Sequence, residues 1–305
     1  MFSVSGCNIK SSHSFPAYSD AEDLPMNILE QYIEKIEESL ENNTWMDLKF
    51  SLTDQVVMPH LVALANRRKP GLNLTYIDSP YDLPEQLMSL SPNDYHSHKY
   101  IICAGDDKVH MGMLDARFID NQLSMILFEP TSLNCTAPAL LAVRINSALG
   151  RELPTIKKPL VLQMDIQRSD YECGIFSLAL AKKAFKNDEC VLKLHHEVAA
   201  RKIETSTLAE SKGIADKFLS VLFYKHTQGL KRMSEYLETK PESIHQPING
   251  KHKKIMDHIK ASYTEINGKL ISKSIHIKRL TEYKALRDDL LNNRYDLSNK
   301  TLSSS

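Results

Sequence analysis

Three side chains in the middle of the chain could together perform nucleophilic catalysis: the thiol of Cys173, the imidazole of His110 and the carboxylate of Glu129. Cys173 opens an apolar helical run, so its sulfur would face unpaired backbone N–H groups and the positive end of the helix dipole. Both favour the thiolate, which is the nucleophilic form of cysteine. A thiolate nucleophile needs a base within hydrogen-bond reach, and the base needs an orienting carboxylate. The sequence therefore offers a Cys–His–Glu set that could attack a carbonyl group.

A fourth residue, Gln167, lies shortly before the cysteine and could donate its amide N–H to an oxyanion, with the backbone N–H of Cys173 as second donor. Each of these residues also has a structural interpretation. A single cysteine at a helix start is commonly a small buried hydrophobe. His110 could be a structural strand residue, Glu129 a surface strand end and Gln167 a solvated turn residue. From the pattern alone both interpretations stay open, because a Cys/His/Glu set can be drawn in most chains of this length.

The candidate residues fall at the ends of predicted secondary-structure elements. Apolar and polar residues alternate over 160–167, which predicts a strand, and the polar turn 168–172 then leads into the helix that starts at Cys173. Residues 108–119 and 123–129 predict a hairpin across a turn at 120–122. His110 would lie on the first strand of that hairpin and Glu129 would end the second. A neighbouring strand at 160–167 would bring the cysteine to the same edge.

The remaining periodicity indicates a mixed architecture. Apolar spacing of three and four residues predicts helices at 26–41, 59–68, 138–149, 230–237 and 273–290. Strands are predicted at 72–77 and 99–104, and residues 240–270 are interpreted as a polar stretch. Because helices precede and follow a central group of strands, the fold class is predicted to be α+β.

Composition excludes several classes of protein. The chain has 305 residues, 42% hydrophobic and 25% charged, with a formal net charge of zero. Bulk charge therefore favours no nucleic-acid partner and no membrane surface, and any anion site must be a local cluster. No apolar run approaches the roughly 18 residues of a membrane span, and the N-terminus lacks the pattern of a Sec signal peptide. The five cysteines have no zinc-ligand spacing, so we expect free thiols and no metal.

Four segments of the chain closely resemble the YopJ/AvrA family of bacterial type III secreted acetyltransferases: KVHMGMLDARF, SMILFEP, DIQRSDYECGIFSLALAKKA and LFYKHTQG. The resemblance runs from about residue 26 to residue 290. It implies a cysteine-protease-like catalytic core, related to ubiquitin-like-protein proteases, with flanking helices that form a regulatory region. It also implies a triad of His110, Glu129 and Cys173, with Gln167 in the place of the oxyanion glutamine.

The resemblance further implies an activity and a destination. Acetyl would pass from acetyl-CoA through a cysteine thioester to Ser, Thr or Lys side chains of host signalling proteins such as MAP kinase kinases, with inositol hexakisphosphate (IP6) as activator. A type III system would deliver the protein into the host cell cytoplasm. Four regions are then expected: a disordered secretion signal at 1–24, the catalytic core at 25–220, a basic helical regulatory region at 221–292 and a tail at 293–305.

Two sets of residues are expected to bind the phosphorylated ligands. The cofactor set that the resemblance and local charge imply is His110, Gln167, Arg168, Lys182, Lys183, Tyr224 and Lys225. The activator set is Arg68, Lys225, His226, Lys278, Arg279 and Lys284. The alternative interpretation is that the pair Lys182 and Lys183, near the end of the helix that starts at Cys173, is a solvated helix end favoured by the dipole. Two other functions also remain open: a cysteine protease that acts on ubiquitin-like modifiers, and a non-enzymatic protein that sequesters a host kinase.

Overall fold

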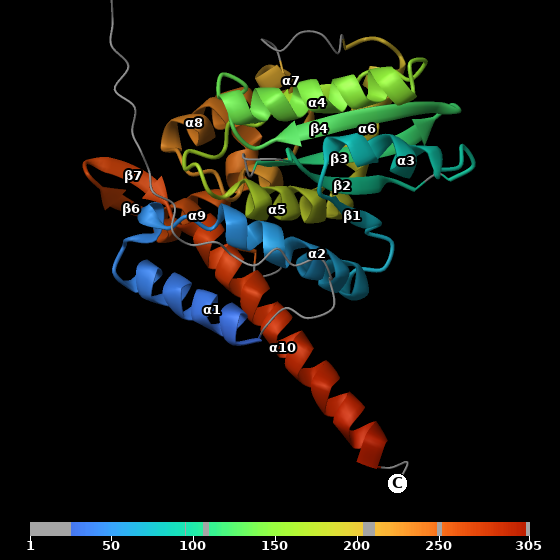
Figure 1. The fold of residues 1–305 in the computed structure, drawn as a ribbon. Helices are drawn as coiled ribbons and strands as arrows, with labels where there is room; N and C mark the ends of the chain where they lie inside the picture. The colour runs from blue at the N-terminus through green and yellow to red at the C-terminus, as the bar shows by residue number, and fades with distance from the viewer. Residues whose placement is uncertain (1–25, 95, 106–109, 204–210, 249–251, 303–305) are drawn as a thin grey trace, which may run out of the picture.

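The structure, a computed structural model, describes residues 26–94, 96–105, 110–203, 211–248 and 252–302, with side chains described as far as residue 292. Within these residues a five-stranded mixed sheet forms the centre of the molecule (Figure 1). Its strands, in spatial order, are β1 (Leu74–Ile77), β2 (His98–Cys103), β3 (Met111–Ile119), β4 (Gln122–Glu129) and β5 (Leu160–Gln163). The outer pairs β1–β2 and β4–β5 are parallel, and the inner pairs are antiparallel.

Each face of the sheet is covered by helices because successive strand residues point to opposite sides. On β4, Met125 and Leu127 join a core cluster with α3 (Leu83–Met88) and α4 (Thr136–Glu152). The alternate residues Ile126 and Phe128 pack against α5 (Cys173–Lys186), with α6 (Asp188–Ala199) beside it. Residues 173–181 of α5 are all buried, so this helix is apolar on every side, as a central helix must be.

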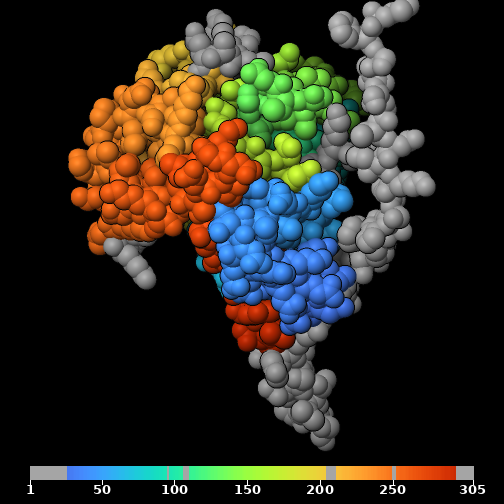
Figure 2. All heavy atoms as spheres, turned by 90° about the vertical axis from the view of Figure 1, so that its left-hand side faces the viewer, coloured from blue at the N-terminus to red at the C-terminus, as the bar shows by residue number. Residues whose placement is uncertain are grey.

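The two ends of the described chain lie side by side beneath α5. Helix α2 (Ser51–Arg68) packs against α5, and α1 (Met26–Glu41) packs along α10 (Ser274–Leu302). Figure 1 shows α10 crossing under α2 and extending beyond the rest of the molecule. In Figure 2 the N-terminal helices, in blue, meet the C-terminal helix, in red, on one surface. Helix α10 also contacts α2 and α5, so it reaches the helix that carries the cysteine.

The segment between α6 and α10 folds into several short elements. It contains α7 (Ser211–Phe218), α8 (Leu230–Thr239), α9 (Ile255–Ser262) and a hairpin of β6 (Tyr263–Ile266) and β7 (Lys269–Ser272). Short 3₁₀ helices occur at Trp45–Asp47, Pro80–Asp82, Val221–Tyr224 and Pro241–His245. None of the helices in the described ranges is long and apolar enough to cross a membrane.

Several predicted elements are confirmed and several need correction. Helix α1 has the predicted bounds, and the β3–β4 hairpin turns at Asp120–Asn121, both with positive φ. Helix α2 begins at Ser51 rather than at residue 59, because Pro59 lies inside the helix instead of starting it. Strand β5 ends at Gln163 rather than at 167, since Asp165 has a φ of 53° and leaves the extended conformation.

The prediction for 240–270 is wrong, because this stretch contains α9 and the β6–β7 hairpin. Asn267 and Gly268 have φ of 50° and 73°, the left-handed pair that a two-residue hairpin turn requires. At the C-terminus α10 continues to Leu302, so the expected boundary at 292 falls inside a helix. The expected secretion signal at 1–24 lies outside the described residues.

Candidate active site

The candidate nucleophile, Cys173, is the first residue of α5 and is 1% exposed. The carbonyl oxygen of Glu172 accepts the first hydrogen bond of the helix, from the N–H of Phe176 at 2.9 Å. The side chain of the N-cap residue, Glu172, makes no capping hydrogen bond to this end of the helix. The backbone N–H groups of the first turn are therefore left for a negative charge, as expected for a thiolate or an oxyanion at this position.

Gly174, next to the nucleophile, lies where α5 packs closely against α2 and β3. A Cβ here would lie 3.0 Å from Asp54 Cβ and 3.0 Å from Met111 Sδ. We expect Gly174→Ala to destabilise the fold by about 1–3 kcal/mol, because the buried contacts must spread to admit a methyl group. Gly150→Ala is the matched control, since nothing lies within 4 Å of its Cβ and alanine favours a helix. Denaturant unfolding measures both; equal stability of the two variants would contradict the close packing.

The imidazole of His110 is paired with a fully buried carboxylate. His110 Nε2 lies 2.9 Å from Glu129 Oε2. The other carboxylate oxygen of Glu129 accepts hydrogen bonds from Thr131 N at 2.9 Å and from Thr131 Oγ1 at 2.7 Å. Glu129 is therefore fixed at both oxygens and can hold one orientation of the ring. Contrary to the prediction, His110 does not lie on a strand but directly before β3, where its carbonyl accepts from Ala104 N at 2.7 Å.

The charges around His110 favour the imidazolium. Burial lowers the pKa of His110, but Glu129 and the hydrogen-bonded Cys173 outweigh it and raise the pKa to about 11. The structure therefore brings the three predicted triad residues together, with His110 between the carboxylate and the thiol. A protonated imidazole beside a thiol at a helix start is the arrangement that keeps a cysteine in its nucleophilic form.

Gln167 lies in the turn before the nucleophile and is buried. Its Nε2 donates to the carbonyl of Ser169 at 2.6 Å, and its backbone N–H donates to Pro130 O at 3.0 Å. The amide has two N–H donors, so one is engaged in the turn and one remains for another acceptor. Its Oε1 has no hydrogen-bond partner among the described residues.

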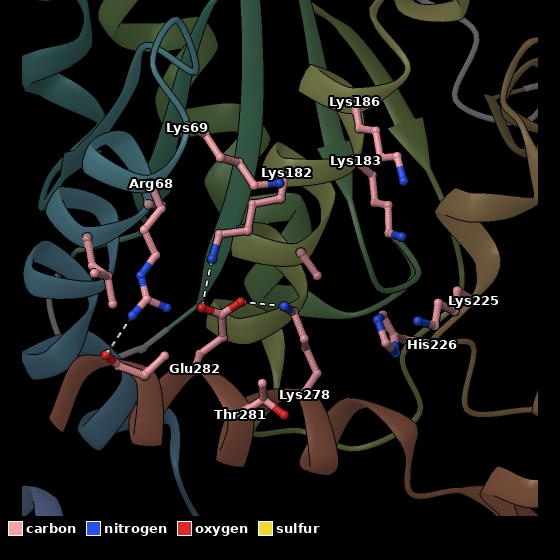
Figure 3. Close-up of a pocket in the computed structure, with 14 residues that line it drawn as sticks. Arg68, Lys69, Lys182, Lys183, Lys186, Lys225, His226, Lys278, Thr281 and Glu282 are labelled. Atoms are coloured by element: carbon pink, nitrogen blue, oxygen red, sulfur yellow. Dashed lines mark hydrogen bonds and ion pairs between the residues drawn. The ribbon is translucent and has the colours of Figure 1, made fainter. Parts of the chain in front are cut away.

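A basic pocket of about 330 Å³ lies between α2, α5, α10 and the segment that follows the 3₁₀ helix at 221–224 (Figure 3). Its cationic lining residues are Arg68, Lys69, Lys182, Lys183, Lys186, Lys225 and Lys278, with His226 beside them. Glu282, the one acidic residue among the described residues that line the pocket, accepts from Lys182 at 2.7 Å and pairs with Lys278. Lys183 follows Cys173 on the same helix, about 15 Å along its axis, so the pocket and the nucleophile share α5.

Burial and mutual repulsion lower the pKa values of several cationic side chains in this pocket. Burial, followed by the nearby lysines, lowers the pKa of Lys183 to about 8. Burial and neighbouring lysines also lower the pKa values of Lys225 and His226. Cations gathered at this density, with one carboxylate among them, fit a ligand that carries several negative charges.

Six of the predicted ligand-binding residues line this one pocket: Arg68, Lys182, Lys183, Lys225, His226 and Lys278. The cofactor set and the activator set are thus not separated in space as far as these residues are concerned. Lys186 was missed, although it follows Lys182 by one helical turn and so shares its face.

Four other predicted residues lie outside the pocket: Arg168, Tyr224, Lys284 and, as described below, Arg279. The Arg168 guanidinium folds back on its own turn, where Nη1 donates to Asp165 Oδ1 at 2.7 Å. Tyr224 is fully buried, and its hydroxyl donates to Asp216 at 2.6 Å, so it offers no exposed atom to a cofactor. Lys284 pairs with Glu37 on the outside of α10.

Arg279 is the clearest departure from the prediction. It is fully buried, and its Nε and Nη2 donate to the two carboxylate oxygens of Asp54 at 3.0 and 2.8 Å. Its neighbour Lys278 points into the pocket, because adjacent residues of a helix face about 100° apart. Arg279 therefore belongs to the contact between α10 and α2 and not to the lining of the pocket.

Comparisons with known proteins place the chain in one family. The family model described as YopJ Serine/Threonine acetyltransferase matches residues 29–285. The serine/threonine-protein acetyltransferase YopJ of Yersinia pestis is 38% identical over 259 residues, covering 85% of this chain and 90% of that protein. The Yersinia pseudotuberculosis protein of the same name is 37% identical with the same coverage.

Solved structures give the same fold. A deletion variant of AvrA with IP6 and CoA matches with a TM-score of 0.80 and 34% identity, over 87% of this chain and 99% of that chain. HopZ1a in complex with IP6 and CoA matches with a TM-score of 0.70 and 21% identity, over 87% and 96% of the two chains, a likeness of fold. The mixed α+β architecture is thus that of the AvrA and HopZ1a structures. From its sequence match, its fold and its Cys–His–Glu arrangement, this chain belongs to the YopJ family of serine/threonine acetyltransferases.

Proposed function

We propose that this protein is a secreted effector that moves acetyl from acetyl-CoA, through a thioester on Cys173, to side chains of host signalling kinases such as MAP kinase kinases. The observation that carries the proposal is the charged His110–Glu129 pair beside a thiol at a helix start. Serine and threonine hydroxyls are the acceptors that the family name supports. Lysine acceptors are a finer expectation from the same resemblance.

In the first half-reaction the Cys173 thiolate attacks the acetyl carbonyl of the thioester. The oxyanion that forms lies near the first backbone N–H groups of α5, and the second amide N–H of Gln167 is our candidate for a further donor. When the intermediate collapses, the bond from carbon to the CoA sulfur breaks. The His110 imidazolium gives its proton to that sulfur, and the acetyl group stays on Cys173.

In the second half-reaction His110 acts as the base. Acetylation removes the contribution of Cys173 to the raised pKa of His110, so the pKa falls and the neutral imidazole becomes more accessible. The neutral ring accepts the proton of the incoming hydroxyl as its oxygen attacks the acetyl carbon. Cys173 leaves as a thiolate, and the ester product departs. Glu129 holds the ring in one orientation throughout.

We further propose that the basic pocket binds IP6 as an activator. A phosphate monoester carries a charge of about −1.5 to −2 at neutral pH, so six of them outweigh the few charges of CoA and suit the seven cationic lining residues better. A cysteine-protease-like core at 25–220 and a regulatory region after residue 220 remain our description of the chain. The pocket draws on both, since Lys183 comes from α5 and Lys278 from α10.

Binding of IP6 is expected to weaken at alkaline pH. Lys183 has a pKa of about 8, and a bound polyphosphate raises it by favouring the ammonium. Affinity is then complete below about pH 8 and falls as the pH rises toward the bound-state value. We expect about a tenfold loss between roughly pH 7.5 and 9.5, with proton uptake in calorimetry across buffers. Lys183→Gln is the control, and wild type without proton uptake near pH 8 would contradict this account.

The direct test of function offers the enzyme two kinds of substrate. Purified protein with acetyl-CoA and IP6 is incubated with a MAP kinase kinase, and acetylated peptides are located by mass spectrometry. We expect acetyl on serine or threonine. Cleavage of a ubiquitin-like precursor without acetyl-CoA, and no acetylation of the kinase, would favour the alternative cysteine protease. A kinase that is bound tightly but left unmodified would favour the sequestering protein.

A further inference from the structure

The turn from Arg168 to Glu172 links the candidate oxyanion residue Gln167 to the nucleophile, and its position decides whether the two can act on one carbonyl. Within the described residues, side chains from elsewhere in the chain hold this turn near both of its ends. Gln228 holds the first part, and Arg279 holds the last part. Neither residue has a role in the proposed chemistry.

Gln228 is fully buried and behaves as a cap for the turn. Its Oε1 accepts from the backbone N–H of Arg168 at 2.5 Å and from that of Ser169 at 3.1 Å. Its Nε2 donates to Ser169 Oγ at 2.9 Å. The backbone of Gln228 also donates to Ile166 O at 2.9 Å and accepts from Ser272 N at 3.2 Å. Gln228 thus links the turn, through its side chain, to strand β7, through its backbone.

Arg279 holds the other end of the turn from α10. Its Nη2 donates to the carbonyl of Tyr171 at 3.0 Å while the same guanidinium grips Asp54 on α2. Its Nη1 lies 3.8 Å from the carboxylate of Glu172, the residue directly before the nucleophile. His276 Nε2, one turn earlier on α10, lies 3.9 Å from that same carboxylate oxygen.

This second contact is not fully satisfied. Glu172 Oε2, His276 Nε2 and Arg279 Nη1 are buried and have no hydrogen-bond partner among the described residues. Burial raises the pKa of Glu172 to about 7, although the charge of Arg279 acts to lower it. Unpaired buried polar groups are costly. A movement of α10 toward Glu172 would shorten these separations of 3.8 and 3.9 Å toward hydrogen-bond range.

Both Gln228 and Arg279 lie close in sequence to residues that line the basic pocket. Lys225 and His226 line the pocket shortly before Gln228, and Lys278 lines it directly before Arg279. Because the pocket cations come from α2, α5, α10 and the 225–226 segment, one polyanion that contacts them all fixes these segments relative to one another. A movement of the pocket residues would pass along the short stretch of backbone to Gln228 or Arg279. The buried side chain of that residue would then pass it to the turn.

We propose that Gln228 and Arg279 are positioning residues that transmit occupancy of the basic pocket to the turn between Gln167 and Cys173. This inference rests on the proposed activation by a polyphosphate. Lys183 in the pocket lies about 15 Å from the catalytic thiol along α5, and the contacts that Gln228 and Arg279 make with the turn do not run through this helix. Neither touches the acetyl donor or the reacting atoms.

The test separates binding from its consequence. For wild type, Gln228→Met, Gln228→Glu, Arg279→Lys and Arg117→Lys, calorimetry gives the dissociation constant of IP6, and mass spectrometry gives the rate of Cys173 acetylation at saturating IP6. Methionine removes the acceptor that caps the turn, whereas glutamate keeps it. Lysine keeps a charge beside Asp54 but cannot also reach Tyr171 O. Arg117 is the matched control, a buried arginine paired with Asp188 on the opposite part of the sheet.

We expect Gln228→Met and Arg279→Lys to bind IP6 within about threefold of wild type and to lose at least tenfold in the stimulated acetylation rate. Gln228→Glu should recover most of that loss, and Arg117→Lys should match wild type. A purely structural role would lower affinity, melting temperature and rate together. If both variants bind IP6 and respond to it as wild type does, the inference is wrong. If wild type itself is not acetylated, the proposed function fails instead.

Discussion

Replacement of Cys173 by alanine is expected to lower the rate of acetyl transfer to a protein hydroxyl by at least about 10,000-fold. The reason is chemical, since alanine cannot form the thioester through which the acetyl group passes. The His110–Glu129 pair and the basic pocket remain in place, so IP6 and acetyl-CoA should still bind. The measurement is the initial rate of kinase acetylation with saturating acetyl-CoA and IP6.

The fold should tolerate this change, because alanine is smaller than cysteine and the site is already at a helix start. Cys190→Ala is the matched control, a free and half-buried cysteine on α6 away from the site. It should keep the wild-type rate. A Cys173→Ala protein that retains more than a tenth of the rate would contradict covalent catalysis and would point to direct transfer.

Removal of two pocket charges through Lys183→Gln and Lys225→Gln is expected to weaken IP6 binding at least about 100-fold, since a charge-assisted hydrogen bond is worth roughly 1.5–3 kcal/mol. Burial, followed by repulsion from neighbouring lysines, lowers the pKa values of both lysines in the ligand-free protein, so their charges are costly there. The same double variant should therefore melt at a slightly higher temperature than wild type without ligand. Calorimetry and thermal melting, each with and without IP6, measure the two effects.

The control removes two charges from outside the pocket. Lys202 pairs with Glu197 on the surface, and Lys284 pairs with Glu37 along α10. The variant Lys202→Gln with Lys284→Gln should bind IP6 within about twofold of wild type if the effect depends on position and not on net charge. A similar loss in both double variants would contradict the assignment of the pocket. It would also restore Lys284 to the activator site, as the sequence predicted.

Local sequence patterns predicted much of the fold. The helix period located α1 and the start of α5, and alternation located β3 and β4. Two failures had visible causes. A proline was taken for a helix start although apolar residues continue before it, and the Asn267–Gly268 turn was overlooked although that pair is a strong hairpin signal.

Other features depend on contacts between distant segments and have no local signature. The role of Gln228 depends on its hydrogen bonds to the turn at residues 168–169, which lies far away in the sequence. Arg279 was predicted to bind the activator, as part of the basic helix that also contains Lys278 and Lys284. It falls on the spacing of Ile275 and Tyr283, which are both buried, so the apolar face of α10 already contained it. A charge on an apolar helix face is a signal that can be sought in a sequence, but its partner Asp54 cannot be read from it.

If Cys173 carries the acetyl group and a polyanion in the basic pocket promotes its transfer, the acetylated cysteine should be detectable directly. The most direct measurement is peptide mass spectrometry of the purified protein after brief incubation with acetyl-CoA, with and without IP6. We expect one acetyl group on the peptide that contains Cys173, formed faster with IP6 and released by hydroxylamine as a thioester should be. A folded protein that binds IP6 but never acquires acetyl on that peptide would contradict this mechanism.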